Sequence, residues 1–229
     1  MDRTCRGMLC LTLTLALQGA VFAAPKPHVI ALGAGKKVPY SVAGDPAGAA
    51  SDDKELRVRP LVIDTRIKEW TTGEAHDVTD RSFAIRRAIR LNDALPGDKV
   101  EHWVWQRGPW LLVDRVTGHI TAIKLPDYDP AVSNVVWFRD YAAYCGLTAS
   151  GRQLYAVVAQ VAARKPLIAK KIGVWNPLDH PTPACAASSW QREPLRITFQ
   201  PTGSAQVSYD LVGLSAVLVE DGEGDDTDN

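Results

Sequence analysis

The sequence lacks every short motif that would identify a common enzyme class. It contains no Gly-x-Ser-x-Gly nucleophile elbow, no phosphate-binding P-loop and no Gly-x-Gly-x-x-Gly dinucleotide fingerprint. Its five histidines, at positions 28, 76, 102, 119 and 180, are too scattered to form a His-x-Glu or His-x-x-x-His pair. A zinc site normally needs such spacing. We therefore expect neither a metal centre nor a cofactor.

Cysteine is scarce, with four residues in the whole chain. Two of them lie within the first ten residues, which leaves Cys145 and Cys185. In an oxidising compartment two remaining cysteines usually pair, and this pair would close a loop of about 40 residues. The alternative is that Cys145 is a nucleophile, which would need a histidine and an orienting partner nearby. We predict the disulfide Cys145–Cys185.

Only one stretch of the chain is long and apolar, and it lies at the N-terminus between residues 9 and 21. Arg3 and Arg6 precede it, and Val21 and Ala23 supply the small residues of a peptidase site. This pattern predicts a signal peptide over residues 1–23 with cleavage after Ala23. A buried helix or an uncleaved anchor is the alternative, although the stretch is short for a membrane span. We expect a periplasmic or secreted protein with no membrane span after cleavage.

The chain also lacks a net charge, because 26 basic residues balance 26 acidic ones. The balance is uneven along the chain. Residues 220–229 are acidic and contain no apolar side chain after position 219, so we predict a disordered acidic tail there. Between the signal and the tail remain 24 basic and 19 acidic residues, a formal charge of +5. That excess is too small to indicate a nucleic-acid partner.

The remaining chain is patterned for β-structure. Short alternating or β-branched segments are separated by Gly- and Pro-containing turns at intervals of 10–20 residues. Examples are the segments 55–64, 110–115, 119–125, 153–161 and 206–219. Asp114 to Gly118 is typical of a tight hairpin, in which Gly118 adopts a positive φ. We predict an all-β, mainly antiparallel fold, built as a short-strand sandwich or a propeller-like stack of sheets.

Three segments bear on the boundaries of this fold. Residues 24–53 are rich in Ala, Gly and Pro, so we expect a flexible N-terminal segment, with short strands at 28–32 and 38–42 as an option. Residues 70–80 are polar and predict a turn. Residues 82–95 fit a strand better than a helix, because a helix would leave Phe83 and Ile89 off the apolar stripe. One short helix remains an option there, and a single β-rich domain is expected over 54–219.

Candidate binding residues come from aromatic and charged clusters. Trp103 and Trp105 share one face of a predicted strand, and on an outer face they would form a stacking platform; core packing is the alternative. Arg139 and Asp140 lie in an aromatic segment that we expect to be a strand over 135–141. They form either a structural ion pair or a ligand-facing cluster. Asp127 and Asp129 could share one Ca²⁺ ion, although the other ligands of such a loop are absent.

These observations favour an exported, non-catalytic binding module of the periplasm or cell envelope. The expected partner is a protein or an envelope glycan. The alternative is an envelope hydrolase with an unidentified acid/base pair, using His119 or His180 with a neighbouring aspartate. A binding module predicts candidate residues on an open surface, whereas a hydrolase predicts a histidine beside a carboxylate in a closed cleft.

Overall fold

The protein is described by a computed structural model over residues 27–41, 55–130, 132–176, 184–213 and 215–219. Within these residues all regular structure is β-strand, and the strands pair antiparallel. The prediction of an all-β antiparallel fold is confirmed. Residues 82–92 form strand β5 (Ser82–Asn92), so the helical option is wrong and the strand preference is right. The expected signal peptide, residues 42–53 of the expected flexible segment and the expected acidic tail lie outside the described residues.

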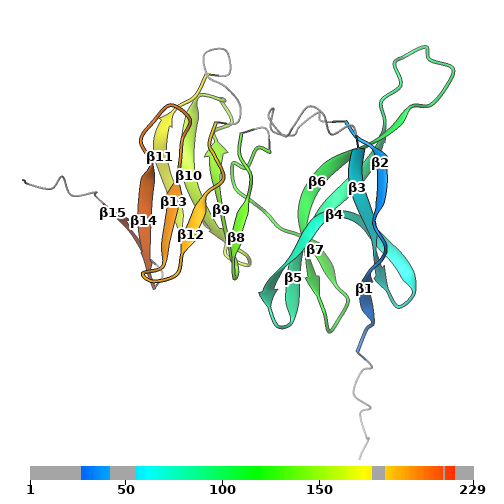
Figure 1. Cartoon of the computed structure of the whole chain (residues 1–229), viewed down its shortest axis with the longest axis horizontal. Coiled ribbons are helices and arrows are strands. Elements are labelled where there is room, and N and C mark those ends of the chain that lie inside the picture. Colours follow the sequence, from blue (N-terminus) through cyan, green and yellow to red (C-terminus); the bar gives the residue numbers. More distant parts are fainter. Residues whose placement is uncertain (1–26, 42–54, 131, 177–183, 214, 220–229) are drawn as a thin grey trace, which may run out of the picture.

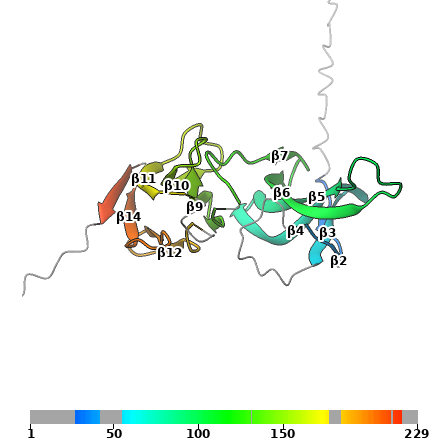
Figure 2. The same ribbon diagram turned by 90° about the horizontal axis from the view of Figure 1, so that it is seen from above.

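The strands form two parts that lie side by side in two perpendicular views (Figures 1 and 2). The region 54–219, expected to be one domain, contributes to both. The N-terminal sheet consists of β1 (Ile30–Leu32), β2 (Lys36–Pro39), β3 (Glu55–Ile63), β4 (Arg66–Thr79), β5, β6 (Trp103–Asp114) and β7 (Ile120–Ala122). The second part consists of β8 (Val136–Phe138), β9 (Tyr141–Leu147), β10 (Gln153–Gln160), β11 (Ile168–Val174), β12 (Ser189–Gln191), β13 (Arg196–Phe199), β14 (Val207–Val212) and β15 (Ser215–Val219).

The N-terminal sheet has the strand order β1-β3-β4-β5-β6-β7, and β2 also pairs with β3. Residues 30–32 and 36–39 thus belong to this sheet, although the sequence suggests a flexible segment over 24–53. The sheet curls, because Tyr40 forms a parallel bridge with Trp105 of β6. The backbone N–H of Ser41 donates to the Trp105 carbonyl at 2.9 Å. The curl brings β2 against β6 and encloses apolar side chains of β2, β3, β5 and β6.

Two strands in this sheet differ from the sequence expectation. Residues 70–80 are not a turn but the second half of β4, which pairs with β3 and β5 on its two edges. The segment is polar because most of its side chains are exposed, yet Thr71 and Thr72 are buried. The expected strand that holds Trp103 and Trp105 and the expected segment 110–115 form one strand, Trp103–Asp114. A register shift opposite Arg86 and Ala88 accommodates Gly108 and Pro109 between them.

The hairpin between β6 and β7 forms as predicted. Gly118 has φ +65°, and its N–H donates to the carbonyl of Asp114 at 2.9 Å. The Asp114 carboxylate accepts the backbone N–H groups of Val116 and Thr117 at 2.8 and 2.9 Å. It also accepts Nε of Arg81 at 2.8 Å. These donors, the Thr117 N–H foremost, lower the pKa of Asp114 from 3.8 to about 2.

The depressed pKa of Asp114 predicts an acid-sensitive contribution to stability. A carboxyl group with a lower pKa in the folded state stabilises the fold above its unfolded pKa, and that contribution is lost as the pH falls from about 4 to about 2. The variant Asp114→Asn should flatten the pH dependence of the urea midpoint in that window. A carboxyl NMR titration of Asp114 should give a midpoint near 2. A midpoint near 3.8 would contradict the capping role.

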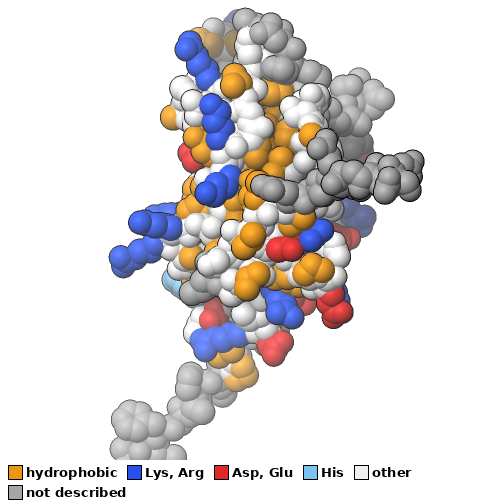
Figure 3. Space-filling view, turned by 90° about the vertical axis from the view of Figure 1, so that its left-hand side faces the viewer, with side chains coloured by type: hydrophobic (Ala, Val, Ile, Leu, Met, Phe, Trp, Pro, Cys, Tyr) orange, Lys and Arg blue, Asp and Glu red, His pale blue; other side chains and the backbone are white. Residues whose placement is uncertain are grey.

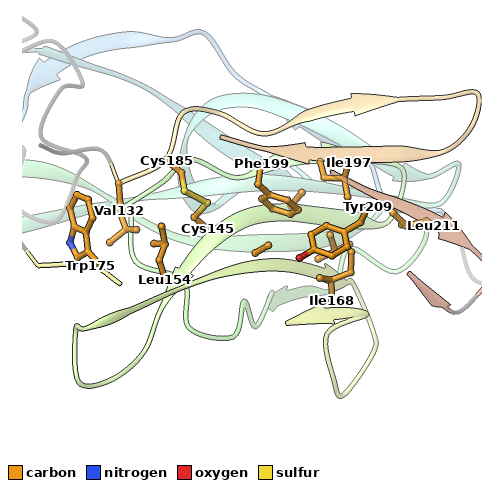
Figure 4. Close-up of a cluster of buried hydrophobic side chains, with 14 residues drawn as sticks. Val132, Cys145, Leu154, Ile168, Trp175, Cys185, Ile197, Phe199, Tyr209 and Leu211 are labelled. Carbon is orange, nitrogen blue, oxygen red and sulfur yellow. A yellow bond between two sulfur atoms is a disulfide. The ribbon is translucent and has the colours of Figure 1, made fainter. Parts of the chain in front are cut away.

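The second part is a sandwich of two four-stranded sheets, β11-β10-β9-β8 and β12-β13-β14-β15. Its core holds inward-facing side chains of both sheets, with Phe199 and Ile197 of β13 fully buried (Figure 4). Cys145 of β9 and Cys185, just before β12, form a disulfide with a Cα–Cα distance of 6.3 Å. The predicted disulfide is confirmed. It joins one sheet to the chain that leads into the other.

The sheet β11-β10-β9-β8 of the sandwich is covered on both faces at β9 and β10. Tyr144 and Val157 lie on the face away from the disulfide, packed against residues of the connecting chain such as Leu125 and Tyr128. The hydroxyl of Tyr144 donates to the carbonyl of Pro126 at 2.6 Å, and burial raises the pKa of Tyr144. Burial on both faces explains why β9 and β10 are almost entirely apolar instead of alternating.

Candidate functional site

A cleft of about 600 Å³ lies where the N-terminal sheet meets the sandwich. We call it the Arg139 cleft. Its lining comes from β4, from the β8–β9 hairpin and from the turn between β12 and β13, and consists of His76, Asp77, Trp137, Phe138, Arg139, Arg192, Glu193 and Leu195. Ligand sites are common at such junctions between structural units, and this volume is in the range of small-molecule pockets.

The β8–β9 hairpin places Arg139 in the cleft. Phe138 pairs with Tyr141, so Arg139 and Asp140 alone form the loop. Two-residue hairpin loops favour residues with positive φ, usually Gly, Asn or Asp. Here Arg139 takes that conformation, with φ +52°. A non-glycine residue in this region carries backbone strain of order 1 kcal/mol or more, and such strain is concentrated at functional positions.

Aromatic rings hold the hairpin against both parts of the molecule. The Trp137 ring stacks on His76 at 5.6 Å and meets Trp110 edge-on at 5.2 Å. Phe138 stacks on Trp190 of the sandwich at 5.4 Å. Nε2 of His76 donates to the carbonyl of Arg139 at 2.7 Å. The backbone that carries the Arg139 side chain is therefore fixed from β4 as well as from its own sheet.

The charged groups of the cleft differ in how far they are already paired. Asp77 binds Nη2 of Arg115 at 2.6 Å, and this hydrogen bond lowers the pKa of Asp77. Neither Arg139 nor Arg192 forms an ion pair with another described residue, and both side chains are exposed. Glu193 is the remaining acidic group in the lining. The cleft thus offers two guanidinium groups beside an apolar wall.

The structure separates the two residues that the sequence grouped as a charged cluster. The predicted strand 135–141 is wrong, because the chain reverses at Arg139 and Asp140 instead of continuing. The Asp140 carboxylate accepts Nε2 of Gln160 at 2.7 Å, and its carbonyl accepts the N–H of Val161 at 2.8 Å. Asp140 therefore ties the hairpin to β10. Of the two loop residues, only Arg139 lines the cleft.

The two candidate tryptophans of β6 also have different surroundings. Trp105 is 7% exposed and packs edge-on against Trp70 at 5.6 Å in the core of the curled sheet. Trp103 is 40% exposed, with the Arg90 guanidinium 4.7 Å from its ring centroid. The core alternative holds for Trp105, so the two rings do not make a joint open platform. Trp103 is at the base of a loop in which Leu95 and Val100 are exposed.

Asp127 and Asp129 lie in a loop whose hydrogen bonds use their main-chain carbonyls. The Asp127 carbonyl accepts the N–H of Leu147, and the Asp129 carbonyl accepts those of Val132 and Ser133. No group of three His, Cys, Asp or Glu side chains suited to a metal occurs among the described residues. The Ca²⁺ hypothesis for Asp127 and Asp129 gains no third ligand from these residues.

Among the described residues there are two histidine–carboxylate pairs, at positions that the sequence did not suggest. Nδ1 of His28 binds Asp64 at 2.5 Å, and Nδ1 of His102 binds Asp93 at 2.5 Å. Both pairs are exposed rather than enclosed. The Asp64 carboxylate also accepts the N–H of Val29, so it anchors the start of β1. His180, one of the two histidines considered for a hydrolase, lies outside the described residues.

The end of the sandwich that faces away from the N-terminal sheet is shown in Figure 3, with Lys and Arg along one side and hydrophobic side chains across the middle. Exposed apolar side chains of β14 and β15 include Val212, Val217 and Leu218. Single exposed apolar residues are ordinary on protein surfaces, so this face carries no functional argument. No helix in the described part of the chain could cross a membrane.

No family model, curated protein or solved structure matches this chain. The Arg139 cleft is therefore interpreted from its own geometry. Sequence reasoning selected Arg139 but missed His76, Arg192 and Glu193. These residues come from segments more than 50 positions away along the chain, and no local pattern connects them. The only sequence signal was the aromatic and charged composition around Arg139.

Proposed function

We propose that this protein is an exported, non-catalytic binding module that holds a carboxylate-bearing glycan of the cell envelope in the Arg139 cleft. The observation that carries the proposal is the position of Arg139. Arg139 lines a cleft of about 600 Å³ and stands on a hairpin loop where an arginine, instead of a glycine, adopts a positive φ of +52°. A residue kept under strain at a cleft is a reason to infer function.

The chemistry of the lining supports a carboxylate on a ring-sized ligand. A guanidinium is a planar fork of donors that matches a carboxylate in a bidentate way. Arg139 and Arg192 supply two such forks. Trp137 and Phe138 supply an apolar wall against which the body of a sugar can lie. Glu193 adds an acceptor for sugar hydroxyl groups.

Export rests on the sequence and on the disulfide. The apolar stretch at residues 9–21 and the small residues before position 24 favour a signal peptide. The Cys145–Cys185 bridge fits an oxidising compartment, because such bonds rarely persist in the cytosol. Together they support a periplasmic or secreted location.

A direct binding measurement tests the proposal. N-acetylmuramic acid and N-acetylglucosamine differ by a lactyl carboxylate, so they are a matched pair of probes. We expect titration calorimetry on the mature chain, residues 24–229, to give at least tenfold tighter binding of the acidic sugar, since one charge-assisted pair is worth about 1.5–3 kcal/mol. Equal affinity for the two sugars, or no binding of either, would remove the basis for the proposal.

A hydrolase is the second candidate, and the observation in its favour is the His28–Asp64 pair. A histidine held by a carboxylate through Nδ1 has its other ring nitrogen available as a general base. Arg115 lines the same cavity of about 400 Å³ as His28. The exposure of both partners and the anchoring role of Asp64 favour a structural pair instead. Hydrolysis of oligosaccharides that contain N-acetylmuramic acid by the wild-type chain, with loss of that activity in His28→Gln, would reverse this preference.

A further inference from the structure

A second charged cavity lies in the N-terminal sheet and shares no lining residue with the Arg139 cleft. It has a volume of about 650 Å³. Three arginines line it, Arg57 and Arg59 from β3 and Arg107 from β6. The loop between β1 and β2 and the middle of β4 complete the wall with Gly33, Gly35 and Gly73. We call it the arginine cavity.

Strand alternation and the curl of the sheet bring the three arginines together. Leu56 and Val58 of β3 point into the core, so Arg57 and Arg59 point to the opposite face. Arg107 is on a different strand, which the sheet order places three strands away. It reaches this region because its Nη1 donates to the Tyr40 hydroxyl at 2.9 Å, on the segment that closes the curl.

The glycines of the wall allow the backbone to lie directly against arginine side chains. A Cβ atom on Gly35 would be 2.7 Å from Nε of Arg57. Gly73 has φ +72°, and its carbonyl accepts Nη2 of Arg59 at 2.6 Å. A side chain at position 35 would displace the Arg57 guanidinium. The shape of the cavity is therefore built around these arginines.

The charge of the cavity is positive on balance. Its two acidic residues are Glu55 and Glu74, and Glu55 already accepts Nζ of Lys37 at 2.8 Å. Arg59 has a buried Nε with no acceptor among the described residues, although its Nη2 is satisfied. The Arg57 guanidinium lines the cavity and forms no hydrogen bond or ion pair with another described residue, so its donors can pair with an oxyanion.

We propose that the arginine cavity binds a phosphate group, free or carried as a phosphomonoester on a sugar. Arg57 provides charge and donors, Arg59 and Arg107 add positive charge to the wall, and Gly73 and Tyr40 hold Arg59 and Arg107 in position. Glu74 limits the affinity by like-charge repulsion. The site is independent of the glycan site, since it uses other residues on another part of the fold.

Titration of the mature chain with inorganic phosphate at low ionic strength tests this site. Arg57→Gln should weaken phosphate binding about tenfold, and Glu74→Gln should tighten it about threefold, because the two changes alter the local charge in opposite directions. Arg66→Gln is the matched control: it removes one exposed positive charge from β4, and Arg66 does not line the cavity. Arg57→Lys should retain part of the affinity, since it keeps the charge and loses the fork.

Two results would overturn the proposal. One is the absence of phosphate binding to the wild-type chain at ligand concentrations up to about 10 mM. The other is an equal loss of affinity in Arg57→Gln and Arg66→Gln, which would mean that only the overall charge matters. A parallel titration with glucose 6-phosphate separates the sources. Tighter binding than inorganic phosphate supports a sugar-borne group, and equal binding supports recognition of the phosphate alone.

Discussion

Replacing Arg139 by glycine is expected to weaken binding of the acidic sugar at least tenfold while leaving the protein as stable as before or more so. The guanidinium that we assign to the carboxylate is removed, which costs affinity. The backbone at φ +52° is relieved, because glycine adopts positive φ without a Cβ clash. The greater freedom of glycine in the unfolded chain offsets part of this gain. We expect a change in unfolding free energy of between zero and about +1 kcal/mol.

The two measurements for Arg139→Gly are titration calorimetry with N-acetylmuramic acid and urea unfolding of the same preparation. Ala162→Gly is the matched control, because Ala162 also has positive φ, at +94°, and does not line the cleft. It should relieve strain without changing the affinity. Loss of stability together with affinity in Arg139→Gly would show that Arg139 acts through the fold. Unchanged affinity would show that its guanidinium does not contact the ligand.

Removing the disulfide is expected to produce the largest loss of stability of any change considered. The double variant Cys145→Ala/Cys185→Ala should lower the free energy of unfolding by about 3–4 kcal/mol, from the entropy of a loop of about 40 residues. Both cysteines are buried, at 0% and 1% exposure, so the lost packing adds to the effect. At about 2–4 °C per kcal/mol for a chain of this size, the melting temperature should fall by roughly 10 °C.

Calorimetry of the double variant and of the wild type after reduction tests this expectation. The two should melt within a few degrees of each other if the bridge itself is the cause. Binding of the acidic sugar at temperatures below the transition should be retained, because neither cysteine lines the Arg139 cleft. Two free thiols in the native wild-type protein, detected by alkylation and mass spectrometry, would contradict the bridge.

The two proposed sites present their arginines on different kinds of backbone. Arg139 stands on a short, strained loop that is fixed from both parts of the molecule. Arg57 stands on a regular strand, and its surroundings are shaped by Gly35. In each case the scaffold fixes the backbone that carries the charged group before any ligand arrives. Such preorganisation reduces the entropy that is lost on binding.

The sequence determined the fold class and the disulfide. Alternating apolar residues and Gly- or Pro-containing turns have a direct local cause, since side chains alternate across a strand and Gly118 supplies a positive φ in a tight hairpin. The pairing of Cys145 with Cys185 followed from arithmetic alone, because no other cysteine remained after the N-terminal segment. Residues 82–92 were assigned correctly for the same local reason.

Local pattern failed where partners distant in sequence decide the structure. Residues 70–79 are polar, and only the hydrogen-bonded edges of β3 and β5 hold them as a strand. The chain reversal at Arg139 and Asp140 was missed, because that loop holds an arginine where glycine or asparagine is the usual signal. Trp105 was considered for an open surface, and the curl of the sheet through Tyr40 buries it instead.

The sequence by itself determined that the fold is all-β and mainly antiparallel, which cysteines pair and that Arg139 lies among aromatic residues. Only the tertiary structure decided that Arg139 meets His76 and Arg192 in a cleft, and that Arg107 meets Arg57 and Arg59 across a curled sheet. The physical reason is the range of the forces involved. Strand alternation and turn geometry act over a few residues, whereas sheet curling and the packing of two parts bring together segments far apart in the chain.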